Sequence, residues 1–267
     1  MPLAVCATPI GNLDDVTLRV LEELRAADLV LCEDTRHTRV LLTRHGIAAR
    51  LLSYHEHNEA ARTAELLPRL AAGERVALVS DAGLPGINDP GARLVSAALA
   101  AGVAVTVLPG ASAVETALVA SGLVGERYQF LGYLPRAEQA RAALWAELAA
   151  WPHPAVAFES PKRLPASLES LALALPERQV AVCRELTKRF EEVVRGSAVE
   201  LAARFREPPK GELTLVLGGA PAVVRDGAEG VAAVAELVAA GLPRRRAADV
   251  VARLTGLPRN RLYRDSL

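Results

Sequence analysis

The sequence predicts an α/β protein built from two α/β domains and a small C-terminal helical region. Short apolar runs alternate with helical stretches over the first 120 residues, as in a parallel sheet flanked by helices. Beyond residue 121, some predicted strands lie close enough in sequence to pair antiparallel. Gly, Ala and Pro make up most of 218–230, which is typical of a linker. We therefore expect domains at 1–120 and 121–218, then a linker and a helical region at 219–267.

The first domain should contain five strands, each followed by a helix. The predicted strands are 3–8, 28–33, 51–54, 76–80 and 103–108, and the predicted helices are 16–26, 38–45, 59–72, 92–101 and 112–120. Most of the strands are continuous apolar runs, so helices should cover both faces of the sheet. Ligands of such sheets bind beyond the carboxyl ends of the strands.

Three loops rich in Gly, Pro and Asp follow strands of this domain, at 8–15, 80–91 and 108–113. The loop 80–91 holds three Gly, two Pro and two Asp in twelve residues, a composition that favours an irregular loop presenting backbone groups to a ligand. Asp81 directly follows its strand and is suited to accept from a hydroxyl or an ammonium group. The first loop contains only Gly11, so it is not the GxGxxG dinucleotide fingerprint.

Charged residues also follow the second strand, where Glu33, Asp34 and Arg36 lie close together. The alternative is a surface loop whose charges satisfy one another in a salt bridge, but three charges at the carboxyl end of a strand favour a site. The histidines nearby are scattered and lack the spacing of a ligand set, so we expect no metal site.

The second domain combines five predicted strands with two clusters of mixed charge. The strands are 128–134, 155–160, 179–186, 191–196 and 212–218, and the helices are 137–149, 164–175 and 199–205. The strands 179–186 and 191–196 should pair antiparallel. The charged residues at the strand ends are Glu159, Lys162, Arg163, Arg184, Glu185, Lys188, Arg189 and, further on, Lys210. By composition alone they are equally consistent with solvated faces and with a surface that holds a phosphate backbone.

The C-terminal region is basic and resembles a helix-turn-helix unit. A helix at 231–240 precedes one with Ala247, Val250, Val251 and Leu254 at helical spacing, and an Arg-rich third helix follows. Residues 241–267 hold seven Arg and two Asp, a net charge of +5 in a chain whose 31 basic and 31 acidic residues balance. This asymmetry indicates a localised contact with an acidic partner.

The three cysteines, Cys6, Cys32 and Cys183, have neither metal nor redox spacing, so we expect buried free thiols in a reducing compartment. The first residues lack the pattern of a signal peptide, and no apolar run reaches membrane-spanning length. We expect a soluble, cytoplasmic protein.

Nine segments in one order carry a family resemblance. They are ATPIGNLDDVTLR, EDTRHTRVLL, ALVSDAGLPGINDPG, LPGASAVETAL, SGL, FLGYLP, FESPKRL, CRELTKRFEEVVRG and PPKGE. In this combination the chain resembles the small-subunit ribosomal RNA methyltransferases of the tetrapyrrole-methylase superfamily, which act on a cytidine 2′-oxygen. Tyr133 stands where the family has Phe in FLGYLP, and Lys162 where it has His in FESPKRL.

The resemblance implies two α/β domains of tetrapyrrole-methylase type with S-adenosylmethionine in the interdomain cleft, and a homodimer. It implies 2′-O-methylation of a cytidine in the decoding region of 16S rRNA, with rRNA or the assembling small subunit as partner. The cofactor contacts that it implies are Pro9, Ile10, Gly11, Asp81, Ala82, Pro85, Ser112, Ala113 and Phe158.

A ribose 2′-hydroxyl is a poor nucleophile at neutral pH, so a base or a lysine near it would help. The candidates are Glu159, Lys162 and Asp34, with Asp81 beside them. The basic residues expected to hold RNA are Arg36, Arg163, Arg184, Lys188, Arg189, Lys210, Arg259 and Arg261.

Two other functions stay open at this point. One keeps the cofactor but methylates a small tetrapyrrole or a protein side chain, and the basic C-terminal region argues against the small molecule. The other is a helix-turn-helix regulator with a ligand-binding body, which the length of chain devoted to enzyme-like loops disfavours.

Overall fold

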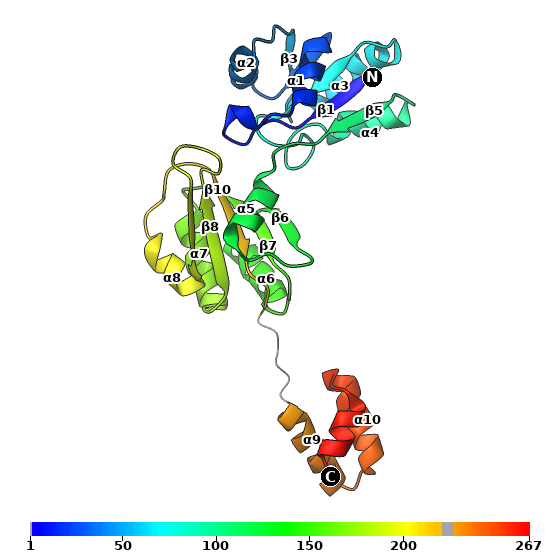
Figure 1. Ribbon diagram of the computed structural model, residues 1–267, viewed down its shortest axis with the longest axis vertical. Helices are drawn as coiled ribbons and strands as arrows, with labels where there is room; N and C mark the ends of the chain where they lie inside the picture. The colour runs from blue at the N-terminus through cyan, green and yellow to red at the C-terminus, as the bar shows by residue number, and fades with distance from the viewer. Residues whose placement is uncertain (1, 221–226) are drawn as a thin grey trace. The chain divides into compact units, whose positions relative to one another are not determined.

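The computed structural model describes residues 2–220 and 227–267 and divides the chain into two units, Met1–Ala220 and Pro221–Leu267 (Figure 1). Within the described ranges, the first unit contains two five-stranded sheets and the second contains three helices. Among the same residues, no helix combines the length and apolar character needed to cross a bilayer.

The first sheet is wholly parallel, with strand order β3-β2-β4-β1-β5. Its strands are β1 (Leu3–Cys6), β2 (Leu29–Cys32), β3 (Leu51–Ser53), β4 (Val76–Leu78) and β5 (Val105–Leu108). Its helices are α1 (Leu18–Ala26), α2 (Thr35–Arg44), α3 (Glu59–Ala71) and α4 (Ala92–Ala100), with the 3-10 turn η1 (Leu13–Asp15) after β1. The parallel sheet predicted from the apolar runs is confirmed.

Alternate residues of these strands build two separate cores, because successive side chains of a strand point to opposite faces. Leu3 and Val5 pack with Leu residues of α3 and α4 on one face. Ala4 and Cys6 pack with residues of α1 and α2 on the other. The interior strand β1 is therefore buried on both sides, which fixes the position of its carboxyl end and of the loop that follows. Cys6, like the other two cysteines, is buried and unpaired, as expected.

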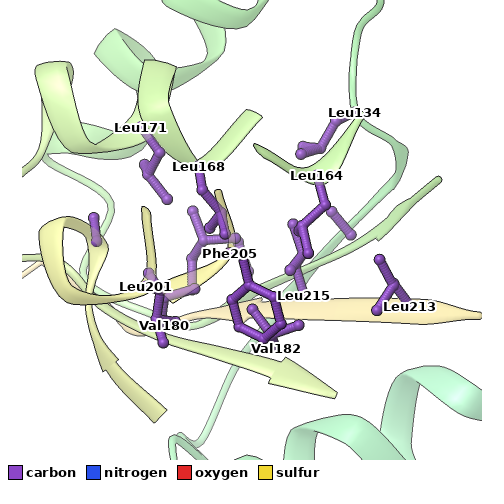
Figure 2. Close-up of a cluster of buried hydrophobic side chains, with 14 of the residues drawn as sticks. Leu134, Leu164, Leu168, Leu171, Val180, Val182, Leu201, Phe205, Leu213 and Leu215 are labelled. Atoms are coloured by element: carbon purple, nitrogen blue, oxygen red, sulfur yellow. The ribbon is translucent and has the colours of Figure 1, made fainter. Parts of the chain in front are cut away.

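The second sheet is mixed, with order β6-β7-β10-β8-β9. Its strands are β6 (Gln129–Tyr133), β7 (Ala155–Glu159), β8 (Gln179–Arg184), β9 (Glu192–Ser197) and β10 (Leu213–Leu217), and its helices are α6 (Glu138–Ala149), α7 (Leu164–Ala174) and α8 (Ala198–Arg204). The strands β6 and β7 run parallel, the remaining pairs are antiparallel, and the predicted pairing of β8 with β9 is confirmed. Figure 2 shows the core on one face, where Leu164, Leu168 and Leu171 of α7 lie against Val180, Val182 and Leu215.

Helix α5 (Ala113–Ser121) covers the other face of this second sheet. Val114, Ala117 and Leu118 of α5 pack with buried residues of β7, β8 and β10. The sequence pattern assigns this helix to the first domain, at 1–120. The periodicity identifies the helix correctly, but its apolar residues are buried by the sheet that follows it in the chain. The domain boundaries themselves stay a prediction.

The C-terminal unit consists of α9 (Gly227–Ala239), α10 (Arg244–Thr255) and α11 (Arg259–Asp265) in its described part. Its small core contains Val234, Ala247, Val251 and Leu262. Leu254, which the helical spacing placed on the buried face of α10, is 72% exposed instead. The buried residues of α10 are Ala247, Ala248 and Val251, with Ala252 packed beside them, so Leu254 lies to one side of the face that meets the core. Part of the predicted linker, at 221–226, lies outside the described residues.

A buried arginine joins three elements of the second sheet and should contribute strongly to stability. Arg178 is 6% exposed and donates to the carbonyls of Leu148, Ala149 and Gly218 at 2.8, 3.1 and 2.9 Å. Replacing Arg178 by Leu leaves these carbonyls without their donor, so we expect a loss of about 3 kcal/mol in the free energy of unfolding. Urea denaturation of the natural chain and of the variant measures this loss.

The control is Arg206→Leu, since Arg206 is exposed. We expect that variant to change the free energy of unfolding by less than about 0.5 kcal/mol. Equal effects of the two substitutions would contradict a special role for the buried guanidinium.

Candidate active site

The site lies where β1 and β4 end, and two loops are joined there by backbone hydrogen bonds. The N–H of Thr8 donates to the carbonyl of Gly83 at 2.8 Å, and the N–H of Gly83 donates back at 3.1 Å. The buried hydroxyl of Thr8 donates to the carbonyl of Ser80 at 3.0 Å. These bonds hold the loop 8–13 and the loop 80–83 in one fixed arrangement at the carboxyl edge of the sheet, where ligands of parallel sheets bind.

A pocket of about 120 Å³ opens between these loops, α2 and two residues of the second sheet's loops. Its lining consists of Thr8, Pro9, Ile10, Gly11, Leu13, His37, Thr38, Leu41, Ser80, Asp81, Ala82, Lys188 and Glu212. Typical small-molecule sites measure roughly 300–1,000 Å³. A nucleoside-sized ligand therefore extends beyond this volume.

Gly11 is the point of closest approach between the first loop and the segment after β8. A Cβ atom at Gly11 would lie 2.5 Å from Cγ of Lys188, 2.7 Å from Oγ1 of Thr187 and 2.9 Å from the carbonyl oxygen of Leu186. The N–H of Asn12 donates to Oγ1 of Thr187 at 3.0 Å. Only a glycine fits at this position without displacing its neighbours.

The segment after β8 holds Lys188 rigidly at the pocket. Nζ of Lys188 donates to Glu185 and to Glu212, each at 2.9 Å. Burial by itself would lower the pKa of Lys188, but the bonds to Glu212 and Glu185 raise it overall. Glu185 and Thr187 have φ of 52° and 64°, a left-handed conformation that costs energy for residues other than glycine. Lys188 therefore lines the pocket as a fixed ammonium group.

Asp81 contributes a carboxylate to the pocket and contacts the start of α2. It accepts from the N–H of Asp34 at 3.2 Å, and Nδ1 of His37 lies 3.6 Å from its Oδ1 atom. Its side chain remains 36% exposed. This position leaves carboxylate lone pairs available to a ligand.

Two further carboxyl groups lie near Asp81, and the second of them was not expected from the sequence. Burial raises the pKa of Glu33, and the negative charge of Asp81 adds to the effect. Burial, followed by the charge of Glu33, raises the pKa of Asp89 to about 6. This end of the sheet thus concentrates negative charge in a partly desolvated environment.

None of the three catalytic candidates is among the described residues that line the pocket. Asp34 caps α2 by accepting from the N–H of Arg36 at 2.8 Å. Hydrogen bonds from the Arg36 side chain and backbone lower the pKa of Asp34 to about 2, which makes it a weak base. Lys162 is exposed in the turn before α7.

Glu159 is 2% exposed and its acceptor positions are taken. It accepts from the N–H of Ser160 at 2.7 Å, from the hydroxyl of Ser167 at 2.5 Å and from Arg163 at 3.1 Å. The geometry therefore favours a structural role for Glu159. No sequence pattern indicates this role, because Ser167 and Arg163 approach Glu159 from a helix start rather than from its own strand.

The predicted cofactor contacts divide into two groups. Pro9, Ile10, Gly11, Asp81 and Ala82 line the pocket, whereas Pro85, Ser112, Ala113 and Phe158 do not. Among this second group, the hydroxyl of Ser112 bonds to Glu115, Ala113 packs beside the α5 core, and the ring of Phe158 lies against Phe130. Thr38 and Leu41 line the pocket from α2 but were missed, although their i, i+3 spacing after a strand was a usable signal.

The predicted RNA contacts of the second sheet fall into two groups, those bonded within the protein and those exposed. Arg163 is turned inward to the carbonyls of Leu134 and Pro135, and Arg184 pairs with Glu192. Arg189 and Lys210 are exposed. In the C-terminal unit, Arg259 and Arg261 form ion pairs with Asp249 and Asp265, respectively.

A larger groove adjoins the pocket along the outer face of α2. It measures about 580 Å³ and is lined by Leu13, Arg36, Arg39, Val40, Thr43 and Arg44. Leu13 lines both the groove and the pocket. Within α2, the residues 35–44 include three arginines and no acidic residue. The groove therefore presents three arginines, of which Arg36 and Arg44 are paired with Asp34 and Asp14 and Arg39 is not, beside a residue that it shares with the pocket.

Two family models match this chain. The model for tetrapyrrole (corrin/porphyrin) methylases matches residues 2–202, and the model for the RsmI C-terminal HTH domain matches residues 225–265. Among solved structures, the methyltransferase CobJ superposes with a TM-score of 0.63 at 20% identity over 82% of this chain and 94% of its own. Uroporphyrin-III C-methyltransferase from Thermus thermophilus, complexed with S-adenosyl homocysteine, superposes with a TM-score of 0.58 at 18% identity over 81% of this chain and 96% of its own. The expected fold is thus confirmed.

Curated relatives are more similar still and match over nearly the full length. Ribosomal RNA small subunit methyltransferase I of Micromonospora olivasterospora is 46% identical over 98% of this chain and 85% of its own. The protein of the same name from Escherichia coli O157:H7 is 42% identical over 99% of this chain and 94% of its own. The chain therefore belongs to the tetrapyrrole methylase family, in the group whose members are named ribosomal RNA small subunit methyltransferase I.

Proposed function

We propose that this protein transfers a methyl group from S-adenosylmethionine to the 2′-hydroxyl of a cytidine in the decoding region of small-subunit rRNA. The observation that supports an RNA substrate is the arginine-lined groove, which shares Leu13 with the pocket. The relatives' name, ribosomal RNA small subunit methyltransferase I, supports the same class of substrate. The choice of a cytidine 2′-oxygen, a cytoplasmic location and a homodimer rest on the family resemblance.

The pocket residues fit S-adenosylmethionine. Ile10, Leu13 and Leu41 supply apolar surface, and Thr38 supplies a hydroxyl beside them. When bound, the cofactor would supply a methyl group on a sulfonium, with the neutral thioether of S-adenosyl homocysteine as the leaving group for in-line attack by an oxygen on the methyl carbon. Members of the methylase family use this cofactor, and one structural neighbour holds its demethylated product.

The charge of the site also suits a cationic cofactor. The pocket lining includes two carboxyl groups, Asp81 and Glu212, and the ammonium of Lys188 bonds to the second of them. Glu33 and Asp89 add negative charge behind Asp81. Opposite charges attract more strongly in a partly desolvated site than in water.

The chain itself contributes mainly alignment. The fixed loops 8–13 and 80–83 hold the cofactor in one orientation relative to the ribose oxygen, and alignment of this kind accounts for much of the acceleration of a displacement reaction. We assign the role of accepting the hydroxyl proton to Asp81 instead of Asp34 or Glu159. Asp81 lines the pocket, whereas the other two carboxylates do not. Lys188 is held as an ammonium by two glutamates and is assigned to positive charge rather than to proton acceptance.

The groove is assigned to the phosphates that flank the target nucleotide. Arg36 and Arg44 each use Nε and Nη2 on a carboxylate, Asp34 and Asp14, respectively. Arg39 forms no ion pair or hydrogen bond within the described ranges 2–220 and 227–267, so its whole guanidinium is available to a phosphate.

The function is tested by mapping 2′-O-methyl marks on small-subunit rRNA after incubation with the purified protein and S-adenosylmethionine. We expect one mark for the natural chain. We expect more than a 100-fold loss of marking, on the order of 3 kcal/mol, for Gly11→Ala, because its Cβ would displace Lys188 and Thr187 at the pocket wall.

The control is Gly73→Ala, which strains the backbone at a φ of 90° but adds a Cβ into open space at a position that does not line the pocket. It should keep the mark. A protein that leaves rRNA unmarked but methylates a precorrin would show that the proposed substrate is wrong.

The salt dependence of RNA binding tests the groove. Replacing Arg39 by Gln should weaken RNA binding several-fold at physiological salt and reduce the slope of log K against log salt by about 0.7–0.9, the value for one phosphate contact. The matched control is Arg19→Gln, an exposed arginine on α1 outside the groove. If both variants keep the slope of the natural chain, the groove does not hold phosphates.

The pH dependence of stability tests the acidic cluster. The pKa of Asp89 is raised to about 6, so between the unfolded value near 4 and about 6 the folded state retains a proton that the unfolded state loses. Stability therefore falls as pH rises through this window. Asp89→Asn should remove that fall and make the protein more stable at pH 7, by at most about 3 kcal/mol before solvent screening.

Urea denaturation at pH 4, 5, 6 and 7 measures the effect. The control Asp15→Asn changes an exposed carboxyl on η1 and should leave the pH profile unchanged. A profile for Asp89→Asn that is parallel to that of the natural chain would contradict the raised pKa.

A further inference from the structure

An exposed aromatic side chain stands at the end of β6, the edge strand of the second sheet. Tyr133 is 60% exposed. Its ring lies 5.6 Å from that of Phe158 at 62°, and Phe158 lies 5.1 Å from Phe130 at 69°. Phe158 thus contacts the Tyr133 ring on one side and is itself packed against Phe130. The rest of the Tyr133 ring faces solvent.

The backbone of β6 is irregular just before this residue. Phe130 is opposite Val156 and Tyr133 is opposite Phe158, so β6 has one more residue than β7 over this stretch. Gly132 lies within this bulge and has a φ of 67°, in the left-handed region. Bulges of this kind re-aim a side chain and are frequent near active sites.

The same bulge brings β6 against the loop 80–91, which carries Asp81 into the pocket. A Cβ atom at Gly132 would lie 3.1 Å from Oδ1 of Asn88. Asn88 itself has a φ of 58°, in the left-handed region. Burial raises the pKa of Tyr133, and the charges of Asp89 and Glu212 add to it. Asp81 and Ala82 of the same loop line the pocket, so one loop connects the end of β6 with the pocket wall.

The exposure of Tyr133 serves no packing purpose in the described unit. The next residue, Leu134, is 2% exposed and fills the core of the second sheet. The Tyr133 hydroxyl has no hydrogen-bond partner in the described part of the chain, so no bond of this kind fixes the ring to the sheet. A large ring supported on one side and open on the other is suited to stack on a flat ligand.

We propose that Tyr133 is the platform on which the base of the target nucleotide stacks, so that its ribose 2′-oxygen is presented to the pocket. This inference rests on the proposed function, which supplies an RNA nucleotide as the flat ligand. Proteins that act on a nucleotide hold its base outside the helical stack, commonly against an aromatic side chain. A tyrosine, a phenylalanine and a tryptophan all provide such a face, whereas an aliphatic side chain does not.

The test compares two RNA probes and two variants. The probes are small-subunit rRNA transcripts in which the nucleotide that receives the methyl mark is either intact or replaced by an abasic ribose. The affinity of each is measured in the presence of S-adenosyl homocysteine. We expect the natural chain to prefer the intact probe by roughly 10- to 100-fold, the contribution of one stacked base.

Tyr133→Leu should lower the ratio of the two affinities to nearly one, because it weakens the binding of the intact probe and not that of the abasic probe. Tyr133→Phe should retain the preference. Both variants should bind S-adenosyl homocysteine as the natural chain does, which shows by calorimetry that the pocket is folded. Tyr128→Leu is the matched control, because Tyr128 is exposed beside the other end of β6 and bonds to Glu115. It should leave the preference unchanged.

An unchanged preference in Tyr133→Leu overturns this inference, while methyl marks placed on rRNA by the natural chain would leave the proposed function standing. A change of oligomeric state in Tyr133→Leu, seen by sedimentation, would overturn it in favour of a contact between copies of the chain. Absence of any mark from the natural chain overturns the proposed function instead.

Discussion

The close approach of the Gly11 backbone to the segment 186–188 is the constraint on which the site depends. It brings a loop of the parallel sheet into contact with a loop of the mixed sheet, so that Lys188 and Glu212 complete a pocket begun by β1 and β4. The contact requires three conditions at once. The first loop must lack a side chain at this point, Thr187 must adopt a left-handed conformation, and the Thr8–Gly83 bonds must hold the loop in place.

The fold could be predicted from the sequence to a large extent, because apolar runs and helical periodicity report burial directly. The strands of both sheets and the antiparallel pairing of β8 with β9 follow from these patterns. The placement of α5 does not follow, since a periodic apolar face does not say which sheet will bury it. The prediction for Leu254 is wrong for a related reason: the spacing identifies an apolar stripe, but the core meets α10 through Ala247, Ala248 and Val251, to one side of Leu254.

The site was predictable only in part. The loop with Asp81 follows from its composition, because a simple turn does not require so much Gly, Pro and Asp at the edge where ligands bind. The contact at Gly11 follows only from the family resemblance, since its loop alone is equally typical of a plain strand-to-helix turn. The roles suggested for Glu159 and Asp34 failed although the groups that occupy their carboxylates are close in sequence, because a charge pattern does not say whether neighbouring charges bond to one another or face a ligand. Arg163 and Ser167 take up the carboxylate of Glu159, and Arg36 takes up that of Asp34. A charged residue at the end of a strand thus indicates where a site lies, but it does not indicate whether that side chain is free to contact a ligand.

The placement of α5 has a consequence for how the chain can be divided. Val156, Ala181 and Val216 of the second sheet are buried against this helix. A fragment beginning at residue 121, as the strand pattern alone would suggest, would carry that apolar face uncovered, and uncovered faces of this kind lead to aggregation. A fragment beginning before Ala113 would keep the cover that the sheet needs. One of the two helical layers on the second sheet thus comes from the chain that precedes its first strand. We therefore expect that the second sheet will not fold stably when it is expressed without this preceding segment.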